Sequence, residues 1–208
     1  MTTLPIRAAL VLTLLFVAVT GLAFPAVVWA VGRVAFPEQA AGSLLRDADG
    51  RVVGSKLLGQ NFSRPEYFHP RPSAAGAGYD AASSGGTNLG PTSDKLVHGI
   101  LDDPRTKDVD ESFLGFGDVA KRYREENGLA ADAWIPADAA TRSASGLDPD
   151  ISPGNAELQL ARVAKARGLD AGHVRRLVAA HTGERWLGLV GEPRVNVLEL
   201  NLALDRAK

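Results

Sequence analysis

The 208-residue sequence contains no cysteine, and it has no surplus of positive charge. Without cysteine the chain cannot form disulfides, present a thiolate nucleophile or bind zinc or an iron–sulfur cluster through sulfur. The 23 Lys and Arg residues against 24 Asp and Glu residues give a net charge of −1. Because a general nucleic-acid-binding protein needs excess cations to displace counterions from phosphates, we predict no nucleic-acid partner.

Familiar catalytic motifs are also missing. The sequence has no GxxxxGK[ST] phosphate-binding loop, no GxSxG nucleophile elbow and no HExxH zinc motif. A GxGxxG/A string starts at Gly76, but it lacks the preceding strand and the capped helix that a dinucleotide site requires. The four histidines lack metal-ligand spacing, so we predict no metal site and place them at the surface or the edge of the core: His69, His98, His173 and His181.

One close pair of carboxylates remains, at Asp148 and Asp150. Side chains that flank a proline in extended chain tend to point apart, so capping and turn roles suit this pair better than acid/base catalysis. The residues alone therefore indicate a non-catalytic protein, with no catalytic residue assigned.

A long uncharged run stands near the start of the chain. Residues 8–32 read AALVLTLLFVAVTGLAFPAVVWAVG. A helix of about 25 residues spans roughly 37 Å, enough to cross a bilayer core of roughly 30 Å. We predict a short tail at 1–7, a transmembrane helix at 8–32 and a soluble domain at 33–208. The alternative, a cleaved signal peptide, is disfavoured because its apolar region is usually only about 7–15 residues long.

The charges beside this run leave its orientation open. Arg7 lies before the run, while Arg33 and Arg46 follow it among acidic residues. Cytoplasmic flanks usually carry the excess of Lys and Arg, and here the two sides are nearly even.

Local signals in the soluble part predict an α+β, or mixed α/β, fold. Leu44–Leu45 and Val52–Val53 flank an Asp-Gly turn and predict a hairpin. Helices are predicted at 117–127, at 153–167 after an N-cap at Ser152, and after Asp170 with Gly183 as terminator. The alternation of Leu198, Leu200, Leu202 and Leu204 predicts a C-terminal strand with one buried face. The Gly- and Pro-rich segment 64–91 carries aromatic residues and is interpreted as a structured loop rather than a linker.

Several unusual strings occur in a fixed order along the chain. They are LGQNF at 58–62, YF at 67–68, RPSAAG at 71–76, YDA at 79–81, SGGTNLGP at 84–91, PAD at 136–138, SGLDP at 145–149, ISP at 151–153, Gln159, RVA at 162–164, GEPRVNVL at 191–198 and LN at 200–201. Together with the N-terminal run, this set resembles the C subunit of the Kdp potassium-transporting ATPases over nearly the whole chain. Two departures are Thr87, where the family usually has Ser, and Asp150, where it usually has His. The segment 101–128 looks longer than is usual and is predicted to be a surface insertion.

The resemblance implies a non-catalytic accessory subunit in the cell (inner) membrane, with a single span. Its implied partners are the ATP-hydrolysing and potassium-binding subunits, which it would bridge and stabilise, together with membrane lipid. One proposal for the family makes it a catalytic chaperone that raises the pump's affinity for ATP, with the residue matching Gln60 contacting the nucleotide. ATP would then be a ligand only within the complex, and no cofactor is assigned to the chain itself. The family is also described with its soluble domain outside the cytoplasm, a placement that we favour and that conflicts with contact to cytoplasmic ATP.

The remaining polar residues of the family strings are candidates for holding loops together or for docking a partner. They are Arg71, Ser73, Asn88, Asp148, Glu192, Arg194 and Asn196. The alternative function is a membrane-tethered extracytoplasmic enzyme or solute-binding module, with Asp138, Asp148 or Glu192 as acid/base groups. It predicts a pocket that holds at least one of these carboxylates with a perturbed pKa.

Overall fold

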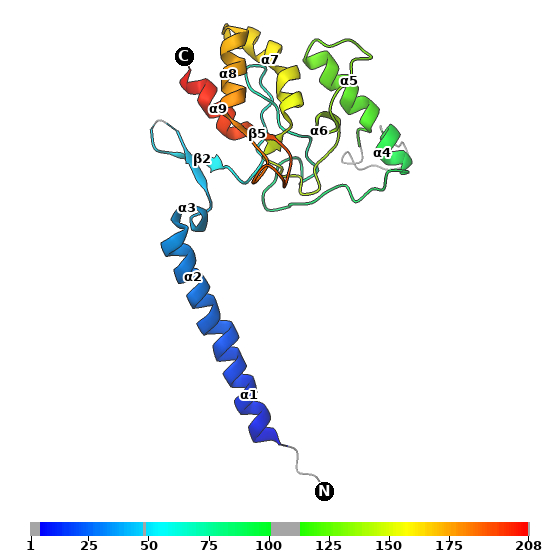
Figure 1. Ribbon diagram of the computed structural model, residues 1–208. Helices are drawn as coiled ribbons and strands as arrows, with labels where there is room; N and C mark the ends of the chain where they lie inside the picture. Colours follow the sequence, from blue (N-terminus) through cyan, green and yellow to red (C-terminus); the bar gives the residue numbers. More distant parts are fainter. Residues whose placement is uncertain (1–4, 48, 101–112, 208) are drawn as a thin grey trace. The chain divides into compact units, whose positions relative to one another are not determined.

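The structure is a computed structural model that describes residues 5–47, 49–100 and 113–207. The chain divides into two compact units, Met1–Leu44 and Leu45–Lys208 (Figure 1). Helices and small sheets occur together and one apolar helix lies near the N-terminus, so the predicted mixed fold class is confirmed.

The first unit consists mainly of one helix of 30 residues, Ile6–Ala35, which contains the predicted span. Its parts are α1 (Ile6–Ala18), the π-helical turn η1 (Val19–Ala23) and α2 (Phe24–Ala35), and α3 (Pro37–Ala40) follows. The wide turn lies just before Pro25, whose ring would otherwise clash with the carbonyl of Gly21. No residue of these helices is buried within the chain.

A hairpin of β1 (Leu44–Arg46) and β2 (Val52–Ser55) confirms the predicted Asp-Gly turn. The carboxylate of Asp47 accepts hydrogen bonds from the backbone N–H groups of Asp49 and Arg51. Gly50 has a φ of +79°, which glycine adopts without steric cost.

Two helices near the C-terminus begin where their capping residues predict. Ser152 Oγ accepts a hydrogen bond from Asn155 N at the start of α7 (Pro153–Arg167), which ends at the left-handed Gly168. Asp170 caps α8 (Ala171–Ala180). This helix ends at Ala180, with His181 as its C-cap, rather than at the predicted terminator Gly183, which belongs to β4 (Thr182–Gly183).

The predicted C-terminal strand is wrong, because residues 197–206 form the helix α9 (Val197–Arg206). Asn196 accepts a hydrogen bond from Glu199 N and caps the helix, a signal that the leucine alternation concealed. Leu200 and Leu204 are fully buried one turn apart, whereas Leu202 is only half-buried. Both periods match the same leucines, and the cap and the packing select the helical one.

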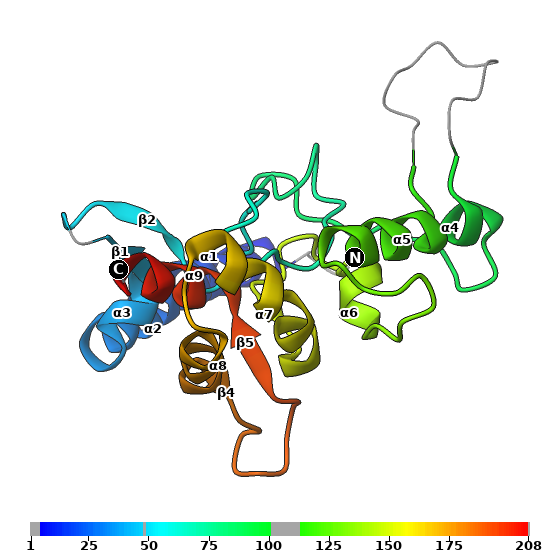
Figure 2. The ribbon, with the colours of Figure 1, turned by 90° about the horizontal axis from the view of Figure 1, so that it is seen from above.

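A small antiparallel sheet has the order β3 (Asp150–Ile151), β5 (Arg194–Asn196), β4. Val195 lies opposite Ile151 on one side and Thr182 on the other. In Figures 1 and 2 the helices α7, α8 and α9 gather around β5. The buried hydrophobic core lies among these elements: Phe68, Ile151, Ala156, Leu160, Val163, Ala164, Val174, Val178, Val195, Val197, Leu200 and Leu204.

Three further helices are α4 (Asp94–His98), α5 (Phe116–Glu126) and α6 (Ala137–Ala140), and α5 confirms the helix predicted at 117–127. Of the predicted insertion 101–128, residues 101–112 lie outside the described residues. In the remainder, Tyr123 is buried and its hydroxyl donates to Asn155 Oδ1 at 2.7 Å. The helix α5 is therefore packed against α7, while its origin as an insertion stays a prediction.

Candidate functional site

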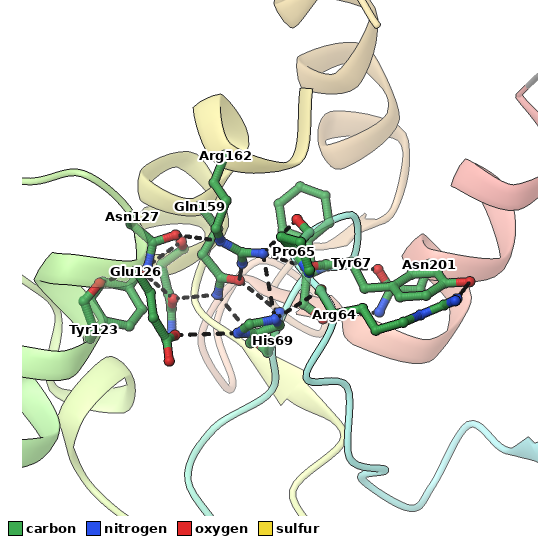
Figure 3. A network of polar contacts seen from close by, with 12 residues as sticks. Arg64, Pro65, Tyr67, His69, Tyr123, Glu126, Asn127, Gln159, Arg162 and Asn201 are labelled. Atoms are coloured by element: carbon green, nitrogen blue, oxygen red, sulfur yellow. Dashed lines mark hydrogen bonds and ion pairs between the residues drawn. The ribbon is translucent and has the colours of Figure 1, made fainter. Parts of the chain in front are cut away.

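Side chains of α7 and α9 bind the backbone of the loop at residues 64–69 (Figure 3). The buried Gln159 accepts a hydrogen bond from His69 N at 2.7 Å and donates one to His69 O at 3.0 Å. Asn201 likewise accepts a hydrogen bond from Phe68 N at 2.9 Å and donates one to Phe68 O at 3.0 Å. An amide side chain offers both a donor and an acceptor, so it satisfies loop backbone as a neighbouring strand would.

The guanidinium of Arg162 joins this loop to two helices. It donates to Asn127 Oδ1 at 3.0 Å, to Pro65 O at 2.7 Å and to Tyr67 O at 3.0 Å. A further hydrogen bond reaches Gln159 Oε1 at 2.8 Å. Gln159 and Arg162 belong to the family strings, and their spacing of three residues, which places them on one face of a helix, is the signal in the sequence that points to a shared role.

A hollow of about 330 Å³ opens beside this network. His69 and Glu126 line it, with His69 Nδ1 3.5 Å from Glu126 Oε2. Interaction with His69 lowers the pKa of Glu126 despite the partial burial of that carboxylate. Tyr79 and Tyr123 also line the hollow, and burial raises the pKa of both phenols, so each stays a neutral hydrogen-bonding group.

Arg71 holds two loops together through its guanidinium. It donates to Thr141 O at 3.0 Å, Thr141 Oγ1 at 3.1 Å and Asp148 Oδ2 at 3.2 Å. The other oxygen of Asp148 accepts a hydrogen bond from Asp150 N at 3.1 Å. Both groups are only partly exposed, so this ion pair orders the segment before β3.

Ser73 contributes a second link to the same segment. Its hydroxyl donates to Gly146 O at 2.6 Å and accepts from Ala75 N and Tyr79 N. The hydroxyl of Tyr79 donates to Arg71 O at 2.7 Å. The GxGxxG/A string starting at Gly76 thus lies in a turn closed by Ser73, and Gly76 itself has a φ of +53°.

Asp150 faces Arg194 and Asn196 from the next strand. Arg194 Nε lies 3.1 Å from Asp150 Oδ2, and Asn196 Nδ2 donates to Asp150 Oδ1 at 3.2 Å and to Lys56 O at 2.8 Å. Burial raises the pKa of Asp150, Arg194 opposes this shift, and the charge of Asp148 adds to it. As predicted, Asp148 and Asp150 turn to different partners. The cross-strand partners of Asp150 lie far along the chain, so no local pattern marks this residue as part of a site.

Gln60 lies apart from these clusters. Its amide donates to Val53 O at 3.1 Å, and a Cβ at Gly54 would lie only 2.5 Å from Gln60 Nε2. It borders a hollow of about 280 Å³ whose lining includes Phe62 and Leu198. The close packing against β2 fixes the position of this side chain.

The last two candidates lie on the surface. Asn88 is exposed with a φ of +53°, a conformation that asparagine tolerates better than most residues. Glu192 is exposed and accepts a hydrogen bond from Arg185 Nη2 at 2.6 Å. The contacts described above connect Arg71, Ser73, Asp148, Arg194 and Asn196 through residues 146–150. Gln60, Asn88 and Glu192 lie elsewhere.

Asp138, an acid/base candidate of the alternative function, holds the start of α7. It accepts hydrogen bonds from Ser152 N at 2.7 Å, Ser152 Oγ at 2.9 Å and Asn155 Nδ2 at 3.0 Å. Over residues 5–47, 49–100 and 113–207, no three His, Asp or Glu side chains gather in a way that could hold a metal ion.

Comparison with known proteins shows similarity to a single family along nearly the whole chain. The family described as the c chain of the K⁺-transporting ATPase, KdpC, matches residues 6–206. A potassium-transporting ATPase KdpC subunit of Caulobacter vibrioides is 52% identical over 200 residues, which cover 96% of this chain and 92% of the relative. Subunits of the same name from Mycobacterium bovis (48% identical; 95% and 96% covered) and Gemmatimonas aurantiaca (52%; 96% and 92%) are similarly close.

Proposed function

Because the chain belongs to the KdpC family, the c chains of K⁺-transporting ATPases, we propose that it is an accessory, non-hydrolytic subunit of a potassium pump. In this role it bridges and stabilises the potassium-binding and ATP-hydrolysing subunits. The observation that carries the proposal is the sequence identity of 48–52% to the KdpC relatives along nearly the full length. The matched length includes both the apolar helix and the second unit, Leu45–Lys208, which we call the soluble unit.

The polar contacts of the soluble unit support assembly rather than chemistry. Each acid/base candidate of the alternative function has a structural partner: Asp138 binds backbone and cap groups, Asp148 pairs with Arg71, and Glu192 pairs with Arg185. A general acid or base must instead be free to exchange a proton with a substrate. The tethered enzyme is therefore the weaker explanation of these carboxylates.

The helix Ile6–Ala35 supports a single membrane span. Its 30 residues correspond to roughly 45 Å of helix, longer than the bilayer core. The hydroxyl of Thr20 donates to Phe16 O, so this polar group is satisfied inside the helix. We place the soluble unit outside the cytoplasm, with lipid as the surroundings of the helix.

We propose that contact with ATP requires the assembled complex. The hollow beside Gln60 is about 280 Å³, slightly below the roughly 300–1,000 Å³ of typical small-molecule sites. Among the described residues, its lining includes the carboxylate of Asp205 and contains no Lys or Arg, so it offers no positive charge to phosphate groups. A role as catalytic chaperone would therefore require residues of a partner subunit, and a cytoplasmic placement of Gln60.

Co-purification tests the proposal directly. Tagged full-length chain should retain the larger pump subunits after detergent extraction, and by itself it should not hydrolyse ATP. Deleting the gene should reduce potassium uptake at low external potassium. Normal uptake in the deletion strain, together with a tagged chain that emerges alone, would refute the accessory role.

Topology can be tested because the chain has no cysteine. Lys121→Cys places a single thiol at an exposed position of α5, and Arg7→Cys places one in the first turn of α1, just before the uncharged run 8–32. In intact cells a membrane-impermeant maleimide should label position 121 and leave position 7 unlabelled. The reverse pattern would put the soluble unit in the cytoplasm and make contact between Gln60 and ATP feasible.

A further inference from the structure

Large apolar side chains stand exposed on the connection between β4 and β5. Four of them are between 62 and 81% exposed: Trp186, Leu187, Leu189 and Val190. In Figure 2 this connection projects away from α7, α8 and α9. The segment lies outside the buried core, so folding of the soluble unit leaves it uncovered.

Residues 185–192 of this connection, which we call the tip, form hydrogen bonds among their own backbone groups. Trp186 N donates to Val190 O at 2.8 Å, and Gly188 N donates to Arg185 O at 3.0 Å. Leu189 N and Val190 N both donate to Trp186 O. Transfer of a peptide group from water to an apolar medium costs much less free energy when the group has a hydrogen-bond partner. These N–H donors therefore stay satisfied when the tip enters an apolar medium.

Leu187 lies in the turn that the hydrogen bond from Gly188 N to Arg185 O closes, and its side chain is 72% exposed. Its φ is +51°, and the next residue, Gly188, has a φ of +72°. A left-handed backbone is unfavourable for leucine and easy for glycine. An apolar side chain is therefore kept at a turn position where folding alone would favour a smaller residue.

Charge at the tip is balanced. Residues 185–192 contain one cation and one anion, and Arg185 Nη2 lies 2.6 Å from Glu192 Oε2 at the base of the tip. A neutral tip needs no anionic lipid and no charged protein surface. It is suited to the uncharged boundary between headgroups and acyl chains, where tryptophan is enriched.

The covalent structure keeps the start of the second unit near a bilayer whenever the helix is inserted. Residues 36–44 join the helix end at Ala35 to the second unit, which starts at Leu45. Nine residues span at most about 32 Å, so lipid is present at a high effective concentration even without other subunits. Lipid adapts to a convex apolar tip, whereas a protein partner would need a matching cavity.

We propose that residues 185–192 form a membrane-contacting hairpin, which inserts Trp186, Leu187, Leu189 and Val190 into the headgroup–acyl boundary of the bilayer that holds the N-terminal helix. The proposal rests on the membrane anchor of the proposed function. It gives the soluble unit a second, reversible attachment beside its covalent one.

Tryptophan quenching in the full chain tests this inference. The three tryptophans are all exposed, at positions 29, 134 and 186, so each can be studied alone after the other two are changed to Phe. The probe is vesicles of phosphatidylcholine with brominated acyl chains, compared with unbrominated ones, and flotation selects the anchored chains. The double variant Trp29→Phe/Trp134→Phe keeps only Trp186. Brominated lipid should quench its fluorescence nearly as strongly as it quenches Trp29 in the chain that keeps only Trp29. The matched control, Trp134 alone, should keep its emission.

The apolar neighbours and the salt dependence sharpen the test. Adding Leu187→Ser and Leu189→Ser to the Trp186-only chain should restore much of the emission, and since both residues are exposed the fold should persist. Added salt should leave the quenching unchanged, because the tip is neutral. Quenching of Trp29 without quenching of Trp186 overturns the hairpin proposal and leaves the anchor intact. Shielding of Trp186 that appears only when the other pump subunits are added also overturns it, in favour of protein docking.

Discussion

No residue of the helix Ile6–Ala35 is buried within the chain, whereas the soluble unit buries the polar side chains of Asn155, Gln159 and Asn201 almost completely. The helix satisfies its backbone by its own hydrogen bonds and exposes apolar side chains. The soluble unit instead supplies buried amide groups to loops that have no neighbouring strand. The two regions therefore depend on different surroundings: the helix needs an apolar medium outside the chain, and the loops need polar partners inside it.

This comparison also explains why many polar residues of the family strings have structural partners. Residues 64–91, all of them described by the structure, form no helix or strand, so hydrogen bonds from side chains inside and outside this segment hold it in place instead. Arg71, Ser73, Gln159, Arg162 and Asn201 all bind loop backbone. A loop held at so many points is a rigid surface, which suits a subunit that binds partners.

The largest expected effect is on the buried amides of the soluble unit. Asn201→Leu would leave both Phe68 N and Phe68 O without their partner. At roughly 1–3 kcal/mol for each of these two buried unsatisfied groups, the free energy of unfolding should fall by about 2–6 kcal/mol. Pulse proteolysis of the full chain in detergent with urea measures this, with the exposed Asn61→Leu as control. Equal midpoints for the two variants would contradict the role of Asn201.

A charge in the middle of the helix should affect only the other region. Leu22→Asp is expected to disfavour membrane insertion by about 2.5–3.5 kcal/mol, whereas Leu22→Ala keeps the segment apolar. Alkaline extraction of membranes should release more of the Asp variant than of the Ala variant. The urea midpoint of the soluble unit should not change. A change in that midpoint would mean that the two regions are energetically coupled.

A smaller effect is expected at the start of α7. Ser152→Ala removes the cap on Asn155 N and one partner of Asp138. The loss should be about 1–2 kcal/mol, as for other N-cap replacements. The same proteolysis assay measures it against the exposed Ser63→Ala. If Ser152→Ala behaves like this control, the cap has no energetic role.

The smallest expected effects are pH-dependent and opposite in sign. The pKa of Asp150 is raised in the folded state, so its ionised form opposes folding at neutral pH, and this cost disappears as the pH falls through the folded pKa. The pKa of Glu126 is lowered, so its ionised form stabilises the fold above its unfolded pKa, and this stabilisation is lost as the pH falls through the folded pKa. Asp150→Asn should thus be slightly more stable than the parent at pH 7, and Glu126→Gln slightly less.

Unfolding midpoints at pH 7 and in acid test this pair. Both differences from the parent should shrink as the pH falls. Shifts of the same sign at pH 7 would show that the two carboxylates do not differ as their surroundings indicate.

Features that depend on neighbouring residues could be predicted from the sequence. The apolar helix follows from one uncharged run, and α7 follows from Ser152 and Pro153 at its start and Gly168 at its end. The hairpin of β1 and β2 follows from its Asp-Gly turn. These signals act within one or two turns of chain, so no tertiary contact is needed to interpret them. The ordered strings further identified the family, which the comparisons confirm.

Only the tertiary structure decided which secondary structure an ambiguous local pattern adopts, and which distant residues become hydrogen-bond partners. The C-terminal leucines match both a strand and a helix, and packing of Leu200 and Leu204 in the core with the cap at Asn196 selected the helix α9. The cross-strand partner Arg194 of Asp150 and the loop-backbone partners of Gln159 and Asn201 lie 44 or more residues away, so no local spacing could reveal them. The exposure of Trp186 likewise depends on what the rest of the fold leaves uncovered. Burial and long-range hydrogen bonds are properties of the assembled chain, whereas capping and apolar length are properties of short segments.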